Sequence, residues 1–359
     1  MPKRIVIRAD GGKEIGGGHI MRCLTLSEAI KRININAEIY FICSEDVKGF
    51  DYLFNTSSIN LNYIPSKNSV YHSEFNWLND AQSTENILKI IGKVDWVIVD
   101  HYKLDAKWER YIKNHIENIL VIDDLANREH YCNIILDQTY GISHERYRSL
   151  VPRDCVVLTG TNYALLRKCF SPNRKDILEF RNKESKEKKV LVSLGASDPL
   201  NYTEFIVDTI LTSKIKTTVD IVLGPINLNK ENLKVKYSHL ENVRVFESIE
   251  PEIMSELMLN SYVAIGAGGT SSWERCSCGL PTIILVMADN QREIAKQLAF
   301  SGAVKVSDVN TLAEDFDNLL SAWEYDPLKY IKSVEACLSV CDGYGTIRVA
   351  KRVIEYGKN

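Results

Sequence analysis

The chain has 359 residues, with 44 Lys or Arg and 47 Asp or Glu, which gives a net charge of −3 at pH 7. This length predicts about two domains, and 45% hydrophobic and 25% charged residues are ordinary for a globular protein. The lack of a basic excess argues against a nucleic-acid partner. Only a short apolar run follows Met1–Arg4, and no later run is long enough to span a bilayer. We therefore expect a cytoplasmic protein with no membrane partner.

The nine cysteines do not follow the spacing of a disulfide framework or a zinc site. Cys276 and Cys278 form one close pair, and Cys337 and Cys341 form another, but neither pair has the further His or Cys ligands that zinc requires. We interpret all nine as reduced thiols and expect neither a metal nor another cofactor.

Short apolar runs rich in Val and Ile alternate with helix-like segments along the chain. A first series lies at 4–8, 37–43, 95–99 and 118–122, and a second at 190–194, 217–223, 243–246, 262–266, 282–286 and 303–306. Most runs are too short for helices. Their alternation with helices predicts an α/β fold with two doubly wound, Rossmann-like domains built on parallel sheets.

The expected domain boundaries follow from these two series. Residues 1–170 would form an N-terminal domain, and residues 190–340 a C-terminal domain. Residues 171–189 are highly charged with few apolar positions, which indicates a solvated linker or an exposed joining helix. Residues 341–359 are expected to form a C-terminal helix that could pack back on the N-terminal domain. Because ligands of open α/β sheets bind at the carboxyl ends of the strands, we expect a ligand cleft where the two domains face each other.

The loop after the first predicted strand is rich in glycine. Five of the eight residues 11–18 are glycines, and Gly16, Gly17 and Gly18 directly precede His19, where a helix is expected to begin. Glycine lets backbone approach a ligand closely, and free N–H groups at a helix start favour an anion such as a diphosphate. The alternative interpretation is a glycine-rich turn with a capping histidine.

Four further side chains are candidates for substrate contacts. Asp10 and Arg22 flank His19 and could orient it or touch a substrate, unless they only pair on the helix surface. Tyr102 lies just past a predicted strand and either lines a ligand pocket or packs at its rim. Arg167 could contact a diphosphate or a sugar, or instead form a salt bridge in the linker.

A second small-residue loop follows the predicted strand at 262–266. It contains Gly268, Gly269, Thr270 and Ser271, with Glu274 one helical turn further on. The hydroxyls could cap a helix or meet phosphate, and a carboxylate at Glu274 is suited to accept hydrogen bonds from both hydroxyls of a ribose. A glutamate on a helix surface is the alternative.

A third loop, after the predicted strand at 282–286, carries the paired amides Asn290 and Gln291. Amide groups can donate to sugar or phosphate oxygens and accept from hydroxyls. Ordinary helix capping by Asp289 or Asn290 competes with this interpretation.

Together these loops resemble the UDP-2,4-diacetamido-2,4,6-trideoxy-β-L-altropyranose hydrolases of pseudaminic acid biosynthesis and their relatives in spore-coat polysaccharide synthesis. The first loop with its helix and the block 269–291 are the specific parts of the resemblance. Supporting motifs cover nearly the whole chain, in order: Val99-Asp100-His101-Tyr102, Ile122-Asp123-Asp124-Leu125, Tyr163-Ala164-Leu165-Leu166-Arg167, Leu194-Gly195-Ala196-Ser197-Asp198-Pro199 and Asp342-Gly343-Tyr344-Gly345-Thr346-Ile347-Arg348.

The resemblance implies a glycosyltransferase-B-like fold, a UDP-sugar substrate, a nucleotide site on the C-terminal domain and His19 as general base. Two departures bear on the identity of the sugar. Ala196 stands where the family pattern suggests a second glycine, and this chain is longer than compact members of the family.

The expected chemistry is hydrolysis of the sugar–UDP bond at the anomeric carbon. Diphosphate is a good leaving group, and a neutral histidine, with an unperturbed pKa near 6.5, is suited to take a proton from the attacking water. Direct attack by water inverts the anomeric centre. Three alternatives stay open: a glycosyltransferase, in which His19 activates an acceptor hydroxyl, a hydrolysing 2-epimerase, and a non-catalytic nucleotide-sugar-binding protein.

Overall fold

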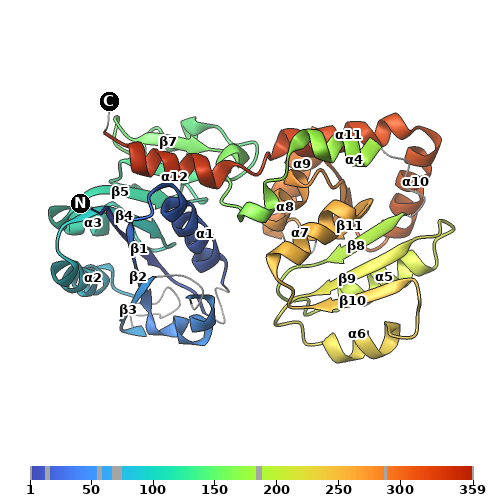
Figure 1. Cartoon of the computed structure of the whole chain (residues 1–359), viewed down its shortest axis with the longest axis horizontal. Helices are drawn as coiled ribbons and strands as arrows, with labels where there is room; N and C mark the ends of the chain where they lie inside the picture. Colours follow the sequence, from blue (N-terminus) through green and yellow to red (C-terminus); the bar gives the residue numbers. More distant parts are fainter. Residues whose placement is uncertain are drawn as a thin grey trace. The chain divides into compact units, whose positions relative to one another are not determined.

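The computed structural model describes residues 2–12, 17–54, 59–66, 75–182, 188–286 and 289–357, without the side chains of 49–52, 289–291 and 293. The chain divides into two compact units. The first comprises Met1–Leu165 and Tyr344–Asn359, and the second comprises Leu166–Gly343. Each unit is built around its own parallel sheet (Figure 1).

The first unit contains strands and helices that alternate along the chain. They are β1 (Arg4–Ala9), α1 (Gly18–Ile33), β2 (Glu38–Ser44), β3 (Asn60–Ile64), α2 (Trp77–Ile91), β4 (Val94–Asp100), α3 (Ala106–Ile112), β5 (Ile116–Ile122), β6 (Ile134–Asp137), β7 (Val156–Thr159) and α12 (Gly345–Glu355). Short 3₁₀ segments lie at Glu45–Phe54, Lys113–His115, His144–Tyr147 and Thr161–Tyr163.

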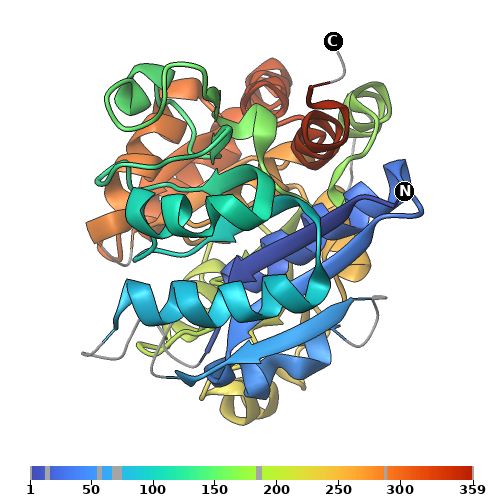
Figure 2. The same ribbon diagram turned by 90° about the vertical axis from the view of Figure 1, so that its left-hand side faces the viewer.

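The first sheet has seven strands in the order β3-β2-β1-β4-β5-β6-β7, and every neighbouring pair is parallel. Side chains of a strand alternate between its two faces. Ile5 and Ile7 therefore pack into the core beneath α1 and α12, whereas Val6 packs on the opposite side with α2 and α3. Figure 2 shows α2 and α3 in front of the strands of this unit.

The second unit repeats the same alternation. It contains α4 (Arg174–Asn182), β8 (Lys189–Ser193), α5 (Tyr202–Leu211), β9 (Thr218–Leu223), α6 (Lys230–Tyr237), β10 (Val243–Glu247), α7 (Pro251–Asn260), β11 (Val263–Gly266), α8 (Ser271–Ser277), β12 (Thr282–Leu285), α9 (Asp289–Ser301), β13 (Val304–Ser307), α10 (Leu312–Tyr325) and α11 (Pro327–Val340), with a 3₁₀ segment at Lys168–Phe170. Its sheet has six parallel strands in the order β10-β9-β8-β11-β12-β13.

The order of strands in each sheet reverses at one point. In the first unit β1 lies between β2 and β4, and in the second unit β8 lies between β9 and β11. Loops on the two sides of such a switch point diverge toward opposite faces, which leaves a crevice at the carboxyl ends of the two strands. The fold therefore places candidate sites after β1 and β4, and after β8 and β11.

Every strand predicted from the sequence is present, with ends within two residues of the expected positions, and the predicted class of two doubly wound parallel sheets is confirmed. Three strands were not predicted: β3, β6 and β7. Among the residues that the structure describes, no helix is both long and apolar enough to cross a membrane.

The segment 171–189, predicted as a linker or an exposed joining helix, includes α4, which belongs to the second unit. Ile177 of α4 is buried in that unit's core, and buried Arg181 donates to the backbone oxygens of Met258 and Cys278. The C-terminal helix α12 belongs to the first unit and packs beside α1. At Gly345 a Cβ atom would collide with the backbone of Ala164, so a glycine is required where this helix begins.

Candidate active site

The first candidate site lies at the switch point of the first sheet. β1 and β4 are paired in parallel, and Ala9 at the end of β1 stands opposite Asp100 at the end of β4. After β1 the chain leads into α1, whose N-terminal cap is Gly17 and whose first residue is Gly18. A Cβ at Gly18 would meet no atom of the described residues within 4 Å, and Gly18 itself is exposed. Gly16 lies outside the described residues.

His19 is held by a carboxylate from the neighbouring strand. Its Nδ1 lies 2.5 Å from Oδ1 of Asp100, and only 8% of the residue is exposed. Two bonds from Arg22, from Nε to Oδ2 and from Nη2 to Oδ1 at 2.6 Å each, fix the Asp100 carboxylate. The thiol of Cys23 adds a weaker donor, with Sγ 3.6 Å from Oδ2. Asp100 is thereby locked against the histidine ring.

The charge on Asp100 determines the tautomer of His19. Burial alone would raise the pKa of Asp100, but the Arg22 guanidinium and His19 outweigh that effect and hold this pKa well below its usual range. An ionised carboxylate can only accept hydrogen bonds, so Nδ1 of His19 must carry a proton and donate it. In the neutral ring Nε2 is then the unprotonated nitrogen, which is the state that a general base needs.

Arg22 does more than pair on the helix surface. Its Nη2 lies 3.2 Å from Nδ1 of His19, and its Nη1 lies 3.6 Å from Oδ2 of Asp124. Its side chain is only 11% exposed. Burial lowers the pKa of Arg22, but the negative charges of Asp100 and Asp124 raise it by more than burial lowers it. The net shift of this pKa is upward, and the guanidinium stays charged. Arg22 therefore joins the ends of β4 and β5 to the start of α1.

Tyr102 lies directly against His19. The two rings meet edge to face, with centroids 4.7 Å apart and planes at 87°. Tyr102 follows β4 by two residues and is half-buried. Because the ring packs on His19, it restricts the rotation of the imidazole and forms part of the surface around it.

Asp10 belongs to a neighbouring buried cluster. Its Oδ1 and Oδ2 accept from Nη1 and Nη2 of Arg8 at 2.6 and 3.0 Å, and its Oδ1 also accepts from the backbone N–H of Ser44. Nε2 of His101 lies 3.2 Å from its Oδ2. Burial raises the pKa of Asp10, but Arg8 and His101 together hold it well below its usual range. Asp10 therefore contacts Arg8 and His101 rather than the ring of His19.

The second candidate site is the loop between β11 and α8. A Cβ at Gly266 would lie 2.8 Å from Nη1 of buried Arg275 and 2.9 Å from the carbonyl oxygen of Ser193, so only glycine fits there. Nη2 of Arg275 donates to the carbonyl oxygen of Ala267 at 2.8 Å, which fixes the path of the loop. A Cβ at Gly269 would meet no atom of the described part of the chain within 4 Å, so that part leaves the outer side of the loop open.

The other predicted residues of this loop differ in exposure. Gly268 is buried and Thr270 is exposed. Thr270 makes no side-chain capping bond to α8. The Ser271 hydroxyl accepts a bond from Arg275 at 3.2 Å. Asn290 and Gln291 both lie in the first turn of α9, but their side chains lie outside the described residues.

Glu274 and Arg167 are brought together in the second unit. Glu274 is half-buried, one turn inside α8. Desolvation raises the pKa of Glu274 to about 7, although the charges of Arg275 and then Arg167 oppose the shift. Arg167 is the second residue of this unit, and its positive charge acts on the carboxylate of Glu274. The residue therefore does not belong to a solvated linker alone.

Similarity to known proteins extends along most of the chain, although no family model matches it. The chain is 27% identical over 267 residues to a UDP-2,4-diacetamido-2,4,6-trideoxy-β-L-altropyranose hydrolase of Campylobacter jejuni, an alignment that covers 72% of this chain and 82% of that protein. It is 25% identical over 361 residues to the spore coat polysaccharide biosynthesis protein SpsG of Bacillus subtilis, which covers 96% and 95% of the two chains. The chain is thus similar in sequence to a UDP-2,4-diacetamido-2,4,6-trideoxy-β-L-altropyranose hydrolase along most of its length.

The proteins similar to this chain differ in length. The chain is 26% identical over 296 residues to an uncharacterized protein of Methanocaldococcus jannaschii, which covers 81% of this chain but 57% of that protein. Our chain thus spans little more than half the length of that relative.

Solved structures confirm the fold. MurG of Acinetobacter baumannii matches with a TM-score of 0.69 at 14% identity, covering 99% of this chain and 100% of MurG. UDP-GlcNAc 2-epimerase of Neisseria meningitidis, solved with UDP-GlcNAc, matches with a TM-score of 0.59 at 17% identity and covers 100% of both chains. The predicted glycosyltransferase-B-like fold, with two Rossmann-like units, is therefore confirmed.

Proposed function

We propose that the chain hydrolyses a UDP-linked 2,4-diacetamido-2,4,6-trideoxy sugar at its anomeric C–O bond and releases UDP and the free sugar. The contact between Nδ1 of His19 and buried, ionised Asp100 carries this proposal, because it makes Nε2 the proton-accepting nitrogen whenever the ring is neutral. The similarity to hydrolases of such sugars supports the substrate class. The product would serve pseudaminic-acid-type biosynthesis.

The reaction is a single displacement at carbon. Nε2 of His19 takes a proton from water as the water oxygen bonds to the anomeric carbon, and the bond from that carbon to the UDP oxygen breaks. The electron pair leaves with UDP as the diphosphate. The Asp100 carboxylate stabilises the imidazolium that forms, because it is already bonded to Nδ1. One displacement inverts the anomeric centre, and it needs no nucleophilic carboxylate.

Hydrolysis in ¹⁸O-labelled water, without any acceptor sugar, tests this proposal. We expect UDP release with the label in the free sugar and none in UDP, because water attacks carbon. Proton NMR recorded before mutarotation should show the anomer inverted relative to the substrate. Mass spectrometry of both products locates the label.

Two results would contradict the proposed reaction. Release of UDP that depends on an added acceptor would indicate a glycosyltransferase. Label in the β-phosphate of UDP would mean attack at phosphorus, and His19 would then not be the base for attack at carbon.

The second unit is proposed to hold the nucleotide. The open side of Gly269 allows a ligand to approach the loop backbone, and its sequence neighbours Gly268, Thr270 and Ser271 belong to the same segment. Glu274 would accept from the ribose hydroxyls. Arg167 would offset the diphosphate charge, and the amides of Asn290 and Gln291 would contact sugar or phosphate oxygens.

Replacing Glu274 by alanine should weaken UDP binding by about 1.5–3 kcal/mol, the range for hydrogen bonds to a charged group. The ribose hydroxyls would lose their shared acceptor. Calorimetric titration of UDP at pH 8 measures the loss. Glu231→Ala, a change at a highly exposed glutamate of the same unit, is the matched control and should bind UDP like the unmodified chain.

The pH dependence of UDP binding separates this role from a loss of structure. Because the pKa of Glu274 is raised to about 7, its carboxylate is mostly protonated at pH 6 and mostly ionised at pH 8. Only the ionised form accepts from both hydroxyls, so affinity should rise about tenfold over this interval. Glu274→Gln cannot titrate and should remove that rise, leaving only the titration of UDP itself. An equal rise in both proteins would place the ribose elsewhere.

A further inference from the structure

A second carboxylate, Asp124, lies next to the proposed base. β5 pairs with β4 in parallel, with Val121 opposite Val99, so residues following β5 lie at the same edge of the sheet as Asp100. Asp124 follows β5 by two residues, and its Oδ2 lies 3.6 Å from Nη1 of Arg22. Arg22 also holds Asp100 and contacts His19. Asp124 is thus joined to the base through a single side chain.

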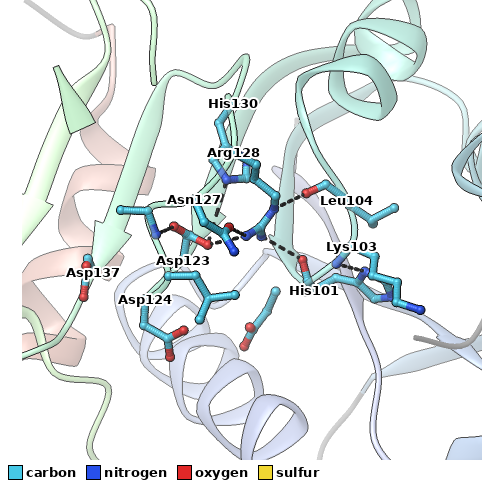
Figure 3. A network of polar contacts seen from close by, with 12 residues as sticks. His101, Lys103, Leu104, Asp123, Asp124, Asn127, Arg128, His130 and Asp137 are labelled. Atoms are coloured by element: carbon cyan, nitrogen blue, oxygen red, sulfur yellow. Dashed lines mark hydrogen bonds and ion pairs between the residues drawn. The ribbon is translucent and has the colours of Figure 1, made fainter. Parts of the chain in front are cut away.

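Two further aspartates at this edge, Asp123 and Asp137, have both carboxylate oxygens bonded within the protein. Asp123 accepts from Arg128 at Oδ1 and from the backbone N–H of Ala126 at Oδ2, both at 2.8 Å. Asp137 accepts from the backbone N–H of Thr139 at Oδ1 and from Arg146 at Oδ2. Their carboxylates fix the loops after β5 and β6. Figure 3 shows the bond from Arg128 to Asp123.

Asp124 is different because one of its oxygens has no hydrogen-bond partner among the described residues. Its Oδ1 is shielded from solvent yet forms no hydrogen bond with any residue that the structure describes, although the side chain as a whole is 29% exposed. In Figure 3 its side chain lies apart from the Arg128 bonds, beside the helix α1. A buried acceptor without a donor costs about 1–3 kcal/mol. A ligand that supplies a donor would remove this cost.

The charge of Asp124 restricts the ligand group that can reach it. A carboxylate accepts hydrogen bonds and repels phosphate oxygens, so the diphosphate is excluded as its partner. The sugar named in the proposed function carries suitable donors: an N–H on each of its two acetamido groups and one ring hydroxyl. A sugar donor bonded here would sit beside Arg22 and His19, at the same edge of the sheet as the base.

We propose that Asp124 is a specificity-determining residue whose Oδ1 accepts a hydrogen bond from an N–H or O–H of the sugar, and so holds the sugar at His19. This inference rests on the proposed function. It assigns the sugar, rather than the nucleotide, to the edge formed by the ends of β4 and β5. Recognition of an uncharged donor by a fixed, buried acceptor also discriminates against sugars that lack that donor, because the carboxylate oxygen would stay unpaired.

The test compares two ligands in a chain that turns over slowly. In the His19→Asn background, calorimetry gives the Kd of UDP and of UDP-2,4-diacetamido-2,4,6-trideoxy-altropyranose, with and without Asp124→Ala. We expect Asp124→Ala to weaken the sugar nucleotide about 10- to 100-fold, the equivalent of one hydrogen bond to a charged group, and to leave UDP within about twofold. Asp124→Asn retains an uncharged acceptor and should give a smaller loss. Asp154→Ala, at an exposed aspartate of the same unit, should change neither Kd.

An equal loss for both ligands, or no loss for either, would overturn the assignment of Asp124. The first result would indicate an effect through the fold, which thermal melting of the variant would also detect. Failure of the proposed function has a separate sign, since the unmodified chain would then release no UDP from the sugar nucleotide while binding could still be measured. A chain that binds neither ligand overturns both proposals.

Discussion

Replacing His19 by asparagine should lower kcat for UDP release by about 10²–10⁴-fold, the usual contribution of a general base. Asparagine is close in size and can still donate to Asp100, so the carboxylate and Arg22 keep a partner. It has no nitrogen lone pair with which to take a proton from water. Because UDP is assigned to the second unit, its Kd should change little. Steady-state kinetics with calorimetry of UDP separates the two effects.

The matched control is an exposed histidine to which no role is assigned. His144→Asn changes a side chain that is 69% exposed and pairs with Glu145 in the first unit. This variant should keep the kcat of the unmodified chain. Near-normal turnover in His19→Asn would remove His19 from the mechanism, whatever the behaviour of the control.

The fold could be predicted from the sequence because most strands are buried on both faces. Such strands read as continuous runs of Val and Ile, as β1 and β4 do. Of the three missed strands, only β3 lacks this signal, because this edge strand alternates Asn with apolar residues (Asn60-Leu61-Asn62-Tyr63-Ile64). β6 and β7 do carry short apolar runs, Ile134-Ile135-Leu136 and Val156-Val157-Leu158, which are as short as those of β11 to β13.

The candidate site could be predicted only in part, because the order of the strands in the sheet differs from their order along the chain. The glycine loop and helix start identified His19, and Arg22 lies one turn further on the same helix. Asp100 lies 81 residues from His19 along the chain, and the sequence indicates it only as part of the motif Val99-Asp100-His101-Tyr102. Asp100 contacts His19 because β4 pairs with β1 on the side of β1 that faces away from β2.

Asp10 shows that proximity along the chain does not by itself fix a contact. Only eight residues separate it from His19, and from the sequence it could orient His19 or touch a substrate. Its side chain instead pairs with Arg8 on the same strand and with the backbone of Ser44 at the end of β2. Alternation along β1 and the position of β2 decide this contact, and neither could be obtained from the glycine loop alone.

Asp100→Asn should have an effect on kcat close to that of removing His19, about 10²–10⁴-fold. The two oxygens of Asp100 accept from Arg22 and from Nδ1 of His19, but asparagine has only one oxygen. If Arg22 keeps that oxygen, the asparagine amide points its N–H at Nδ1, and the ring proton must move to Nε2. The nitrogen needed as the base would then be blocked. Asp100→Glu keeps an ionised acceptor and should retain more activity than Asp100→Asn.

A double-variant cycle distinguishes this tautomer effect from general damage to the fold. Asp100→Asn also leaves the nearly buried charge of Arg22 with a weaker partner, so some loss of thermal stability is expected whether or not Asp100 acts through His19. The kinetic outcome differs between the two cases. If Asp100 acts only through the histidine, adding Asp100→Asn to His19→Asn costs little further kcat, because the base is already absent. Fully additive losses would mean that Asp100 serves the reaction by another route, and the tautomer argument would fail.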